Sequence, residues 1–533
     1  MYTVKYSQKE VEEKLDSLNT KYINISRDIT QHNTNINTNT ENIATLNTKV
    51  EDIEKVVTEL NKLPKQNTTY SFIVDQRWLN NSSDPDMLIS DPFIVNKDGS
   101  RTSIRKATDP KASTYENLML YLKKNTHAYF STFDSSTGIM VLKQLSDTNR
   151  LKYKNGKNID KTKDHNVFIK FPCDIYYKSE AIIPPDESEV NEDYILVTIS
   201  IDVPSDEDLQ NWQKYSQYDL IAVYNSYKKN NKYYSISGVK PTLKTSHDSD
   251  NTIYSNMGSA FSGITYEAHT FLAILLYAYY NSVLGNEICG YGTPINDSNG
   301  APKYPRISGL TDRLGMTDTD STTGNGMTWS NMDYTQIMQG YGDDIASTNF
   351  WGLENIFGEC DHHISNIVCV KPPFISNYIE TNGSILITKL NGEDIEYTTK
   401  EAFNADYNNE KHGFFVIYDR LKTNIVRAVH IGLIPTNVKD GGVIKKLRFG
   451  KHCDFIPKEL ANKNAGGIRY YFDIAQLGNY YDAKNVVLRA SCGATGGAVT
   501  LFKCKYESHQ ATDSMGSRMM FLGTKDTIVI SDN

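Results

Sequence analysis

A heptad repeat close to the start of the chain is the feature that most restricts how it can fold. From Val11 to Leu60, successive core positions are separated alternately by four and three residues, for about seven heptads. This rhythm keeps one stripe of side chains on a single face of an α-helix, which is typical of a coiled coil. The a positions are Leu15, Tyr22, Ile29, Ile36, Ile43, Val50 and Val57, and the d positions are Leu18, Ile25, His32, Asn39, Leu46, Ile53 and Leu60.

The residue types at these positions favour a parallel trimer. Ile occurs at both a and d, a combination that leans towards three strands rather than two. His32 and Asn39 would place two polar layers in the core of the bundle. Either these layers hold an ion or water that fixes the register, or they only cost stability and prevent slippage. We expect residues 1–64 to form a stalk, a rod of about 75 Å that Pro64 ends.

The segment 65–165 is predicted to be a β-rich connector domain. Its β-prone stretches are YSFIV, AYFSTF and GIMVLKQL, which are separated by turns rich in Asn, Ser, Asp and Gly. A helix is predicted over residues 113–124, with Ser113 as its N-cap and Glu116 completing a capping box. The basic stretch 150–166 is interpreted as a solvated loop or junction.

The segment 166–533 is predicted to mix strands and helices. The stretches VFIKFPCDIYYKSE and DYILVTISIDV read as strands on either side of an acidic turn, and Asp219–Gly238 reads as a hairpin with its turn at KKNNK. A helix is predicted over Thr265–Val283, with Thr265 as its N-cap and Glu267 in its first turn. It is apolar nearly all round, so we expect it in a core. The long loops after it are of a kind that commonly binds ligands.

Composition argues against several classes of function. The net charge is −8 and the basic residues are spread along the chain, which argues against nucleic acid as a partner. The 35 Tyr favour β-rich, hydrogen-bonding surfaces.

Seven Cys without a CxxC pair predict buried thiols in a chain made in a reducing cytosol. The first residues lack the apolar core of a signal peptide. The longest apolar run, Phe271–Tyr280, is about half of a bilayer span, so we expect no membrane insertion.

Five segments of the second half carry a resemblance to a known family. In order they are ITYEAHTFLAILLYAYYNS, GLTDRLGMTDT, NFWGLENIFGE, VVLRASCGATGGAVTLFKCKY and MGSRMMFLG. This order resembles phage fibre and adhesin domains with the C-type-lectin-like fold of formylglycine-generating enzymes and sulfatase-modifying factors. In that family the third segment commonly runs Gly-Leu-Glu-Asn, an aromatic residue, then Gly-Asn-Val-Trp-Glu-Trp. The residues that match it are Gly352, Leu353, Glu354, Asn355, Phe357 and Gly358.

The match is partial. After Gly358, the family's Asn-Val-Trp-Glu-Trp is replaced by ECDHH, residues 359–363. Near the end, Gly516 and Arg518 match a closing Gly-Phe-Arg, with Ser517 in place of Phe. The family's Arg-Gly-Gly-Ser-Trp region is replaced by Arg489, Gly493, Gly496 and Gly497.

The resemblance extends back to about Val167 and covers about two thirds of the chain. It implies that residues 166–533 form a C-type-lectin-like α+β domain for adhesion. Joined to the stalk, such a domain resembles a virion fibre of a tailed bacteriophage, with the crAss-like phages as one candidate group.

The ECDHH segment, residues 359–363, admits four interpretations. A zinc site would need ligands from afar, such as His452 and Cys453. A Cys–His nucleophile would need a base positioned by folding. A formylglycine-type oxidase, as the resemblance implies, would need Cys492 and Cys504 as partnered cysteines. The fourth interpretation, which we adopt, is a structural turn and strand, so no catalytic residue is predicted.

Two further sets of residues are candidates for binding. Asp318, Asp320 and Asn325 form an oxygen-rich loop that suits Ca²⁺. The loop lacks the Gly and terminal Glu of an EF-hand, so a polar surface loop is favoured and no cofactor is predicted. Carbohydrate would be recognised by aromatic faces together with amide and carboxylate groups. The residues chosen on that basis are Trp329, Tyr334, Asn349, Phe350 and Trp351, of which Trp351 suits a core equally well.

These observations predict a non-enzymatic, homotrimeric virion fibre, on the head or the tail of the particle. It would be made in the host cytoplasm and attach to capsid or tail proteins through its N-terminus. Its lectin-like domain would bind a host-surface glycan or protein, with avidity from three copies. Two alternatives stay open: a fibre-borne enzyme, either polysaccharide-degrading or of the formylglycine type, and a purely structural capsid decoration.

Overall fold

A computed structural model describes the greater part of the chain. The described residues are 14–21, 23–24, 49, 66–77, 88–282, 295–296, 302–304, 307–319, 347–356, 361–409, 411–433, 442–448, 452–454, 456–462, 489–490 and 515–531. The chain divides into two compact units, Met1–Asn67 and Thr68–Asn533. This division lies three residues after the predicted end of the stalk at residue 64.

In the first unit, residues 14–21 are helical. Leu15, a predicted core position of the coiled coil, is 52% exposed in the single chain. The polar layers at His32 and Asn39 lie outside the described residues, as do most other heptad positions, so the coiled coil stays a prediction.

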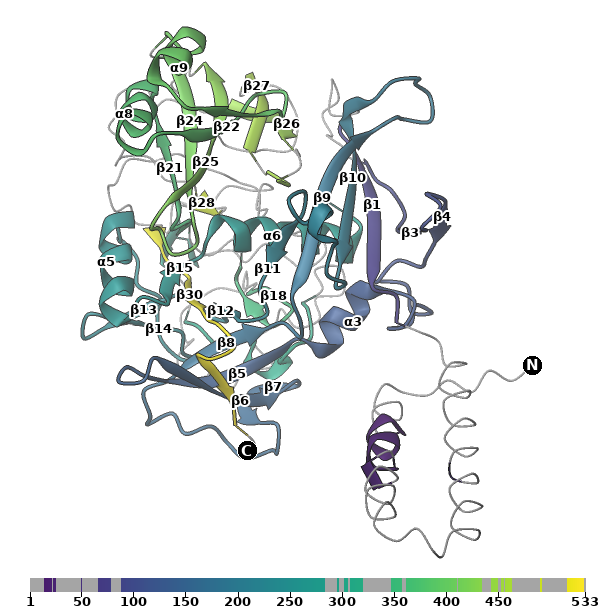
Figure 1. Ribbon diagram of the computed structural model, residues 1–533. Coiled ribbons are helices and arrows are strands. Elements are labelled where there is room, and N and C mark those ends of the chain that lie inside the picture. Colours follow the sequence, from purple (N-terminus) through teal and green to yellow (C-terminus); the bar gives the residue numbers. More distant parts are fainter. Residues whose placement is uncertain are drawn as a thin grey trace, which may run out of the picture. The chain divides into compact units, whose positions relative to one another are not determined.

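The second unit contains a seven-stranded antiparallel sheet (Figure 1). Among its central strands, Tyr70 lies opposite Ile199, and Tyr177 lies opposite the same residue on the other side. Of the strands predicted on either side of the acidic turn, Ile175–Ile182 and Asn191–Ser200 form one hairpin, whereas the start of the first stretch, Asn166–Lys170, is a strand of the other sheet. The strand order is β11 (Gln213–Tyr215), β9 (Ile175–Ile182), β10 (Asn191–Ser200), β1 (Thr69–Asp75), β3 (Phe93–Val95) and β4 (Arg101–Ser103), with β2 (Leu88–Ile89) also on β1.

An eight-stranded sheet forms the second layer. Near its centre, Tyr129 pairs with Phe168, and at one edge Val529 runs parallel to Val141. Its order is β15 (Phe261–Gly263), β30 (Met519–Leu522), β12 (Asp219–Ala222), β8 (Asn166–Lys170), β5 (His127–Asp134), β6 (Ile139–Ser146) and β31 (Ile528–Ile530), with β7 (Asn149–Tyr153) also on β6.

The strand pairing corrects the predicted domain boundary at residues 165/166. Each sheet contains strands from both sides of that boundary, since β5 pairs with β8 and β1 pairs with β10. Residues 68–165 are therefore part of the same compact unit as residues 166–533, and do not form a separate connector domain.

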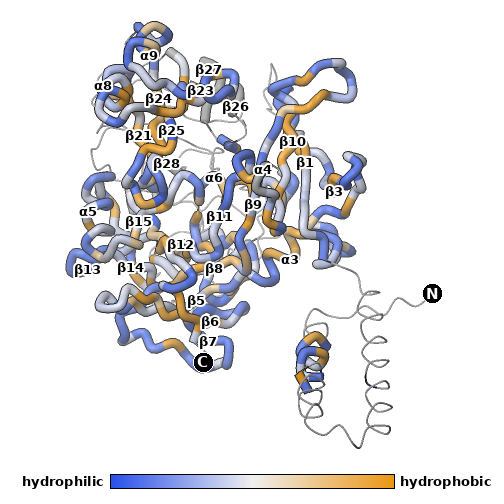
Figure 2. Tube along the Cα trace, viewed as in Figure 1, coloured by the Kyte–Doolittle hydropathy of each residue, from blue (hydrophilic) through white to orange (hydrophobic). Residues whose placement is uncertain are grey.

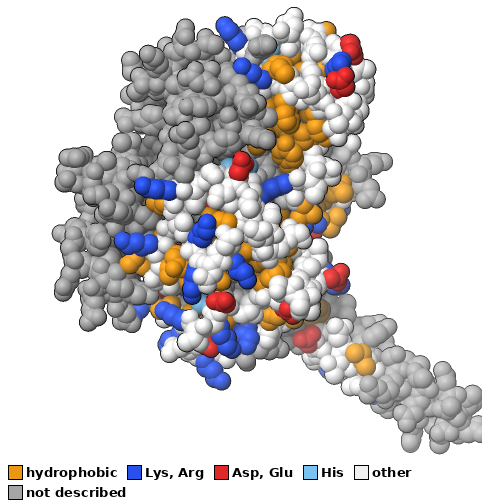
Figure 3. Space-filling view, turned by 90° about the vertical axis from the view of Figure 1, so that its left-hand side faces the viewer, with side chains coloured by type: hydrophobic (Ala, Val, Ile, Leu, Met, Phe, Trp, Pro, Cys, Tyr) orange, Lys and Arg blue, Asp and Glu red, His pale blue; other side chains and the backbone are white. Residues whose placement is uncertain are grey.

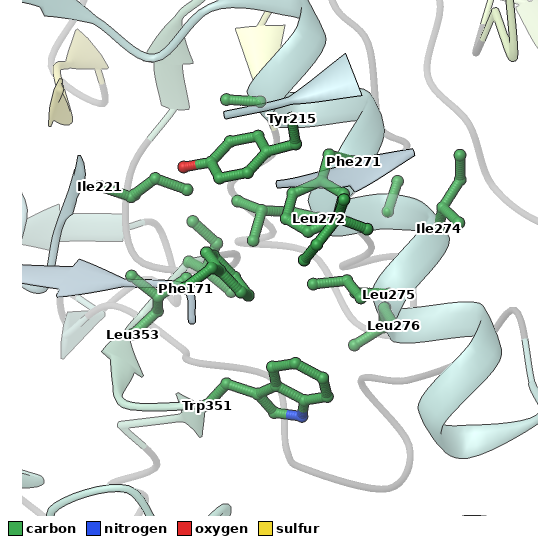
Figure 4. Close-up of a cluster of buried hydrophobic side chains, with 14 of the residues drawn as sticks. Phe171, Tyr215, Ile221, Phe271, Leu272, Ile274, Leu275, Leu276, Trp351 and Leu353 are labelled. Carbon is green, nitrogen blue, oxygen red and sulfur yellow. The ribbon is translucent and has the colours of Figure 1, made fainter. Parts of the chain in front are cut away.

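Helix α6 (Tyr266–Tyr280) lies at the centre of the main core, beside both sheets (Figure 1). Thr265 is its N-cap, as predicted, and the Thr265 hydroxyl accepts from the amide of Ala268. The helix ends three residues earlier than predicted, because Asn281 adopts the left-handed conformation that closes helices. Figure 4 shows its side chains packing towards Phe171 and Tyr215. The Phe271 and Tyr215 rings stack with centroids 4.2 Å apart.

The helix predicted over residues 113–124 is shorter than expected. Helix α3 (Leu118–Asn125) begins five residues later, because Asn117 and not Ser113 is its N-cap. The Asn117 carboxamide accepts from the amides of Met119 and Leu120. The carboxylate of Glu116 accepts from Arg105 instead of completing a capping box.

A smaller α+β module was not predicted. Its five-stranded sheet has the order β21 (Ile367–Val370), β24 (His412–Tyr418), β25 (Ile425–Leu433), β22 (Ile385–Thr388) and β23 (Asp394–Tyr397). Helices α8 (Pro372–Asn382) and α9 (Lys400–Asp406) pack on this sheet around Phe403 and Ile379, in a core of their own. It is the lobe labelled α8, α9 and β24 in Figure 1.

Short elements complete the described structure. They are α4 (Asp206–Leu209), β13 (Tyr227–Lys229), β14 (Lys232–Tyr234), α5 (His247–Met257), β16 (Ile295–Asn296), β17 (Pro302–Tyr304), η2 (Asp312–Leu314), β18 (Asn349–Phe350), β19 (Leu353–Glu354), β20 (Asp361–His363), β26 (Gly442–Arg448), β27 (Ile456–Asn462), β28 (Arg489–Ala490) and β29 (Met515–Gly516). The protein is thus of the mixed α+β class, as predicted. Figure 2 shows the apolar segments concentrated along the strands and α6, with hydrophilic connections around them. Within the described part of the chain, no helix is long and apolar enough to cross a membrane.

Candidate ligand-binding site

The predicted ligand-binding residues that the structure describes are buried. Asn349 and Phe350 are fully buried and Trp351 is 1% exposed, so these side chains do not form a surface that a ligand can reach. Phe350 and Trp351 belong to the main hydrophobic cluster. Their prediction as ligand-contacting residues is corrected to a role in the core, where the large apolar area of Trp351 stabilises the fold. Trp329 and Tyr334 lie outside the described residues.

The oxygen-rich loop uses its first carboxylate within the fold. Asp318 accepts from Lys123 Nζ at 2.5 Å and from the amide of Trp351 at 2.8 Å. Asp320 and Asn325, the other two residues of the predicted loop, lie outside the described residues. Among the described residues, no group of three or more His, Cys, Asp or Glu is placed to hold a metal ion.

The two histidines of the ECDHH segment are buried on β20. Nε2 of His362 lies 2.7 Å from the carboxamide oxygen of Asn225, and Nδ1 of His363 lies 3.1 Å from the carboxylate of Asp250. Burial lowers the pKa of His362 well below its ordinary value. These contacts agree with the structural interpretation of both residues. Glu359 and Cys360 lie outside the described residues.

His452 and Cys453, the distant residues that a zinc site would need, have other contacts in the described structure. His452 contacts Asp394 at 2.9 Å and Gln213 at 3.3 Å, next to the small module. Cys453 is fully buried, and burial raises the pKa of its thiol to about 12, which keeps it protonated. The cysteines that an oxidase would need, Cys492 and Cys504, lie outside the described residues.

Residues that carried the family resemblance form a buried polar network. The carboxylate of Glu354 accepts from the amides of Gly309 and Thr311, at 2.7 and 2.8 Å. Burial, with the nearby charge of Asp312, raises the pKa of Glu354 to about 7. Arg518 donates to the carbonyl oxygens of Glu354, Asn355, Ala222 and Val223. This network supplies hydrogen-bond partners to backbone amides and carbonyl oxygens of irregular segments in the interior. Its role is therefore structural.

An accessible pocket lies elsewhere, where β5 and β14 meet the end of α5. It has a volume of about 140 Å³, well above the roughly 10–15 Å³ that one water molecule needs. Its apolar wall is formed by Phe133, Tyr233, Tyr234, Met257 and Phe261, and its polar wall by Ser131, Ser135, Asp164, His165, Asn166 and Lys232.

The β13–β14 hairpin supplies one wall of this pocket. Its turn residues, Asn230 and Asn231, both have positive φ, of 50° and 56°, which suits a tight two-residue hairpin turn. The turn at KKNNK is therefore confirmed, but the hairpin is shorter than the predicted Asp219–Gly238, because β12 (Asp219–Ala222) pairs with β8 and β30 instead. Alternation along β14 buries Tyr233 and leaves Lys232 exposed and Tyr234 half-buried. The Tyr233 hydroxyl donates to Asp250, which fixes the hairpin on α5.

The opposite wall is preorganised by the residues before β8. His165 stacks on Phe130 with ring centroids 4.5 Å apart, and its Nδ1 donates to the carbonyl oxygen of Lys163 at 2.7 Å. Burial lowers the pKa of His165, so the ring is neutral near pH 7. Asn166 accepts from the amide of Ser235 at 2.8 Å, which ties this wall to the residue after β14.

The mouth of the pocket carries one acidic and one basic side chain. Asp164 and Lys232 are exposed. Burial, followed by the charge of Asp164, raises the pKa of Tyr234, which therefore stays a neutral hydroxyl. Figure 3 shows the face of the molecule that carries α5 and the β13–β14 hairpin, with Lys and Arg side chains spread over it.

This pocket was missed from the sequence because its residues come from four separated segments. The sequence predicts a solvated loop for the basic stretch 150–166, yet its last residues line the pocket and Arg150, at its start, is 1% exposed. The strand pattern of β5 and the turn at KKNNK are local signals, but β14 belongs to a separate two-stranded sheet, and long-range contacts such as that of Ser235 with Asn166 bring it beside β5.

No protein-family model matches this chain, and no curated protein matches it.

Proposed function

We propose that this protein is the subunit of a homotrimeric virion fibre of a tailed bacteriophage, which binds a host-surface glycan without enzymatic activity. The stalk would be the coiled coil of residues 1–64, and the remainder would be a lectin-like head. The observation that carries the proposal is the pocket, which combines aromatic rings with a carboxylate and an ammonium group at its mouth and with the buried carboxamide of Asn166 in its wall.

The pocket's chemistry suits a sugar ring better than an apolar ligand. Small-molecule sites use apolar and aromatic walls for contact and a few polar groups for orientation. Here Phe133 and Tyr234 offer half-buried rings, and Asp164, Asn166 and Lys232 offer both donors and acceptors for hydroxyl groups. A cavity of about 140 Å³ matches one ring-sized group and implies weak binding per site. Trimeric display would raise the overall affinity by avidity.

The stalk is supported by the heptad repeat and by one structural detail. Leu15 is half exposed on the described helix of a single chain, at a position where the repeat places a core residue. An isolated helix with an exposed apolar stripe is marginal in water, and a partner helix covers that stripe.

A glycan array with the purified full-length protein tests the proposal, run beside an assay of polysaccharide degradation. We expect binding to a restricted set of bacterial surface glycans without turnover. Tyr234→Ala and Lys232→Ala should each reduce the signal at least about tenfold, equivalent to about 1.4 kcal/mol. The matched control is Lys229→Ala, which removes an exposed lysine directly opposite Lys232 on the same hairpin, outside the pocket.

Each other outcome contradicts the proposal in a different way. Turnover of a polysaccharide would favour the fibre-borne enzyme. Neither binding nor turnover would favour a structural decoration. Binding that is unchanged in both pocket variants would place the glycan site elsewhere.

A further inference from the structure

Lys422 and Asn251 make an unusual contact between the small module and α5. Lys422 lies in the turn between β24 and β25, with a positive φ of 61°, and its Nζ is 2.6 Å from Oδ1 of Asn251. The two residues are 171 positions apart in the chain. Oδ1 is bonded to the carboxamide carbon Cγ, so the amine nitrogen already lies beside an acyl carbon.

We propose that Lys422 and Asn251 become joined by an isopeptide bond. Nζ of the neutral amine forms a bond to Cγ of Asn251, and the bond between Cγ and Nδ2 breaks. One proton passes from Nζ to Nδ2, which leaves as ammonia. The reaction exchanges one amide for another, so it needs neither an oxidant nor a reductant, and no water is consumed.

The groups around the leaving nitrogen are placed to move that proton. The Asn251 Nδ2 lies 3.3 Å from Nδ1 of His247 and 3.1 Å from its Nε2. Nε2 of His247 is 3.1 Å from the carbonyl oxygen of Ser365, which can only accept, so Nε2 carries the hydrogen and Nδ1 is the acceptor. A carboxylate oxygen of Asp248 lies 3.5 Å from the same Nδ1. His247 can therefore take a proton from the addition intermediate and return it to Nδ2.

The amine is also placed to be reactive. Burial lowers the pKa of Lys422 to about 8, against the opposing effect of the nearby Asp250 carboxylate. A lysine in this state is in part neutral near pH 7, and only the neutral amine is a nucleophile. Asp250 itself is held by Thr245 and His363. Asp250 is thus fixed in place on α5.

A covalent link here would tie the module to α5 independently of what the protein binds. It would close a loop of 171 residues in the unfolded chain, which reduces the entropy of unfolding as a disulfide does. This inference does not rest on the proposed glycan binding, and either can fail alone.

Intact-mass spectrometry of the purified full-length protein tests the bond. We expect the wild type to be lighter than its sequence mass by one ammonia, and a tryptic digest to contain one branched peptide that joins Lys422 to Asn251. Lys422→Arg keeps a cationic donor for Asn251 Oδ1 but cannot form the amide, so it should have the full mass calculated for its sequence. The matched control, Lys400→Arg, replaces an exposed lysine of the same module that pairs with Glu380 and should still show the loss.

Two results would overturn the proposal. One is a wild-type protein with the full sequence mass after storage at pH 8. The other is an ammonia loss that persists in Lys422→Arg, because it would then arise from another group, such as a succinimide at an asparagine.

Discussion

Arg150 and Asp312 form a buried ion pair, in which Nε of Arg150 lies 3.5 Å from a carboxylate oxygen. The two side chains are 0% and 2% exposed. A second carboxylate, that of Glu354, lies 3.8 Å from the same guanidinium. The arginine also donates to Asn349 Oδ1 at 3.1 Å. One cation therefore holds β7, η2 and the β18–β19 turn together in the interior.

Removing this cation should destabilise the second unit strongly. Arg150→Ala leaves Asp312 and Glu354 buried without a compensating charge, which costs about 3–5 kcal/mol of unfolding free energy. Urea unfolding followed by circular dichroism measures the change. The matched control is Lys152→Ala, an exposed residue of the same strand, for which a change within about 0.5 kcal/mol is expected. Equal effects from the two substitutions would show that the buried pair contributes little.

The burial of Arg150 could not be predicted from the sequence. Arg150 stands in a basic, polar stretch, and composition alone predicts a solvated loop. Its burial depends on acceptors that come from residues 311–349, which no local pattern connects to it. By contrast, β9, β10 and α6 were predicted well, because alternation and an apolar run are local signals. The N-cap of α3 was missed because Asn117 and Ser113 are both good caps, and only tertiary contacts decide between them.

The candidate site was less predictable than the fold. Aromatic residues in a loop were expected to meet a ligand, but the hydrophobic effect buries Phe350 and Trp351 instead. The pocket depends on how β5 and β14, which belong to different sheets, approach each other, and this follows from long-range contacts such as that of Ser235 with Asn166. The β22–β25 pairing of the small module is parallel, and such pairing leaves no hairpin signal in the sequence.

His269 should make the protein sensitive to acid. It is fully buried on α6, and neither ring nitrogen has a hydrogen-bond partner among the described residues. Burial lowers the pKa of His269 to about 4. The unfolded chain takes up a proton near pH 6.5 and the folded chain only near pH 4. Stability is therefore fully present above pH 6.5 and is lost as the pH falls, by about 3 kcal/mol in total.

Unfolding free energies measured at several pH values between 4 and 7 check this expectation. His269→Leu cannot be protonated, so its stability relative to the wild type should rise as the pH falls. His127→Leu serves as a control, because it leaves His269 in place and should preserve the acid sensitivity. Parallel pH profiles for the wild type and His269→Leu would contradict the assignment.

Trp351 should matter for stability and not for ligand contact. Its ring packs against Tyr279, with centroids 5.5 Å apart at 90°, and is 1% exposed. Trp351→Ala removes this buried area and should cost about 3–5 kcal/mol. Trp212→Ala, at a partly exposed tryptophan beside Lys178, should cost much less. If the folded fraction of Trp351→Ala lost glycan binding while retaining wild-type stability, the core role would be wrong.

The heptad repeat predicts which residues hold the stalk together. Ile29→Asp combined with Ile43→Asp places two charges at a positions, where each copy meets the others in a desolvated core. We expect this double variant to sediment as a monomer at micromolar concentration, whereas the wild type sediments as a trimer. Thr38→Asp combined with Thr45→Asp adds charge at two outward c positions and should remain trimeric. Because both variants carry the same added charge, dissociation of only the first would trace assembly to the heptad core. A wild type that sediments as a monomer would remove the basis for a stalk and for avidity with it.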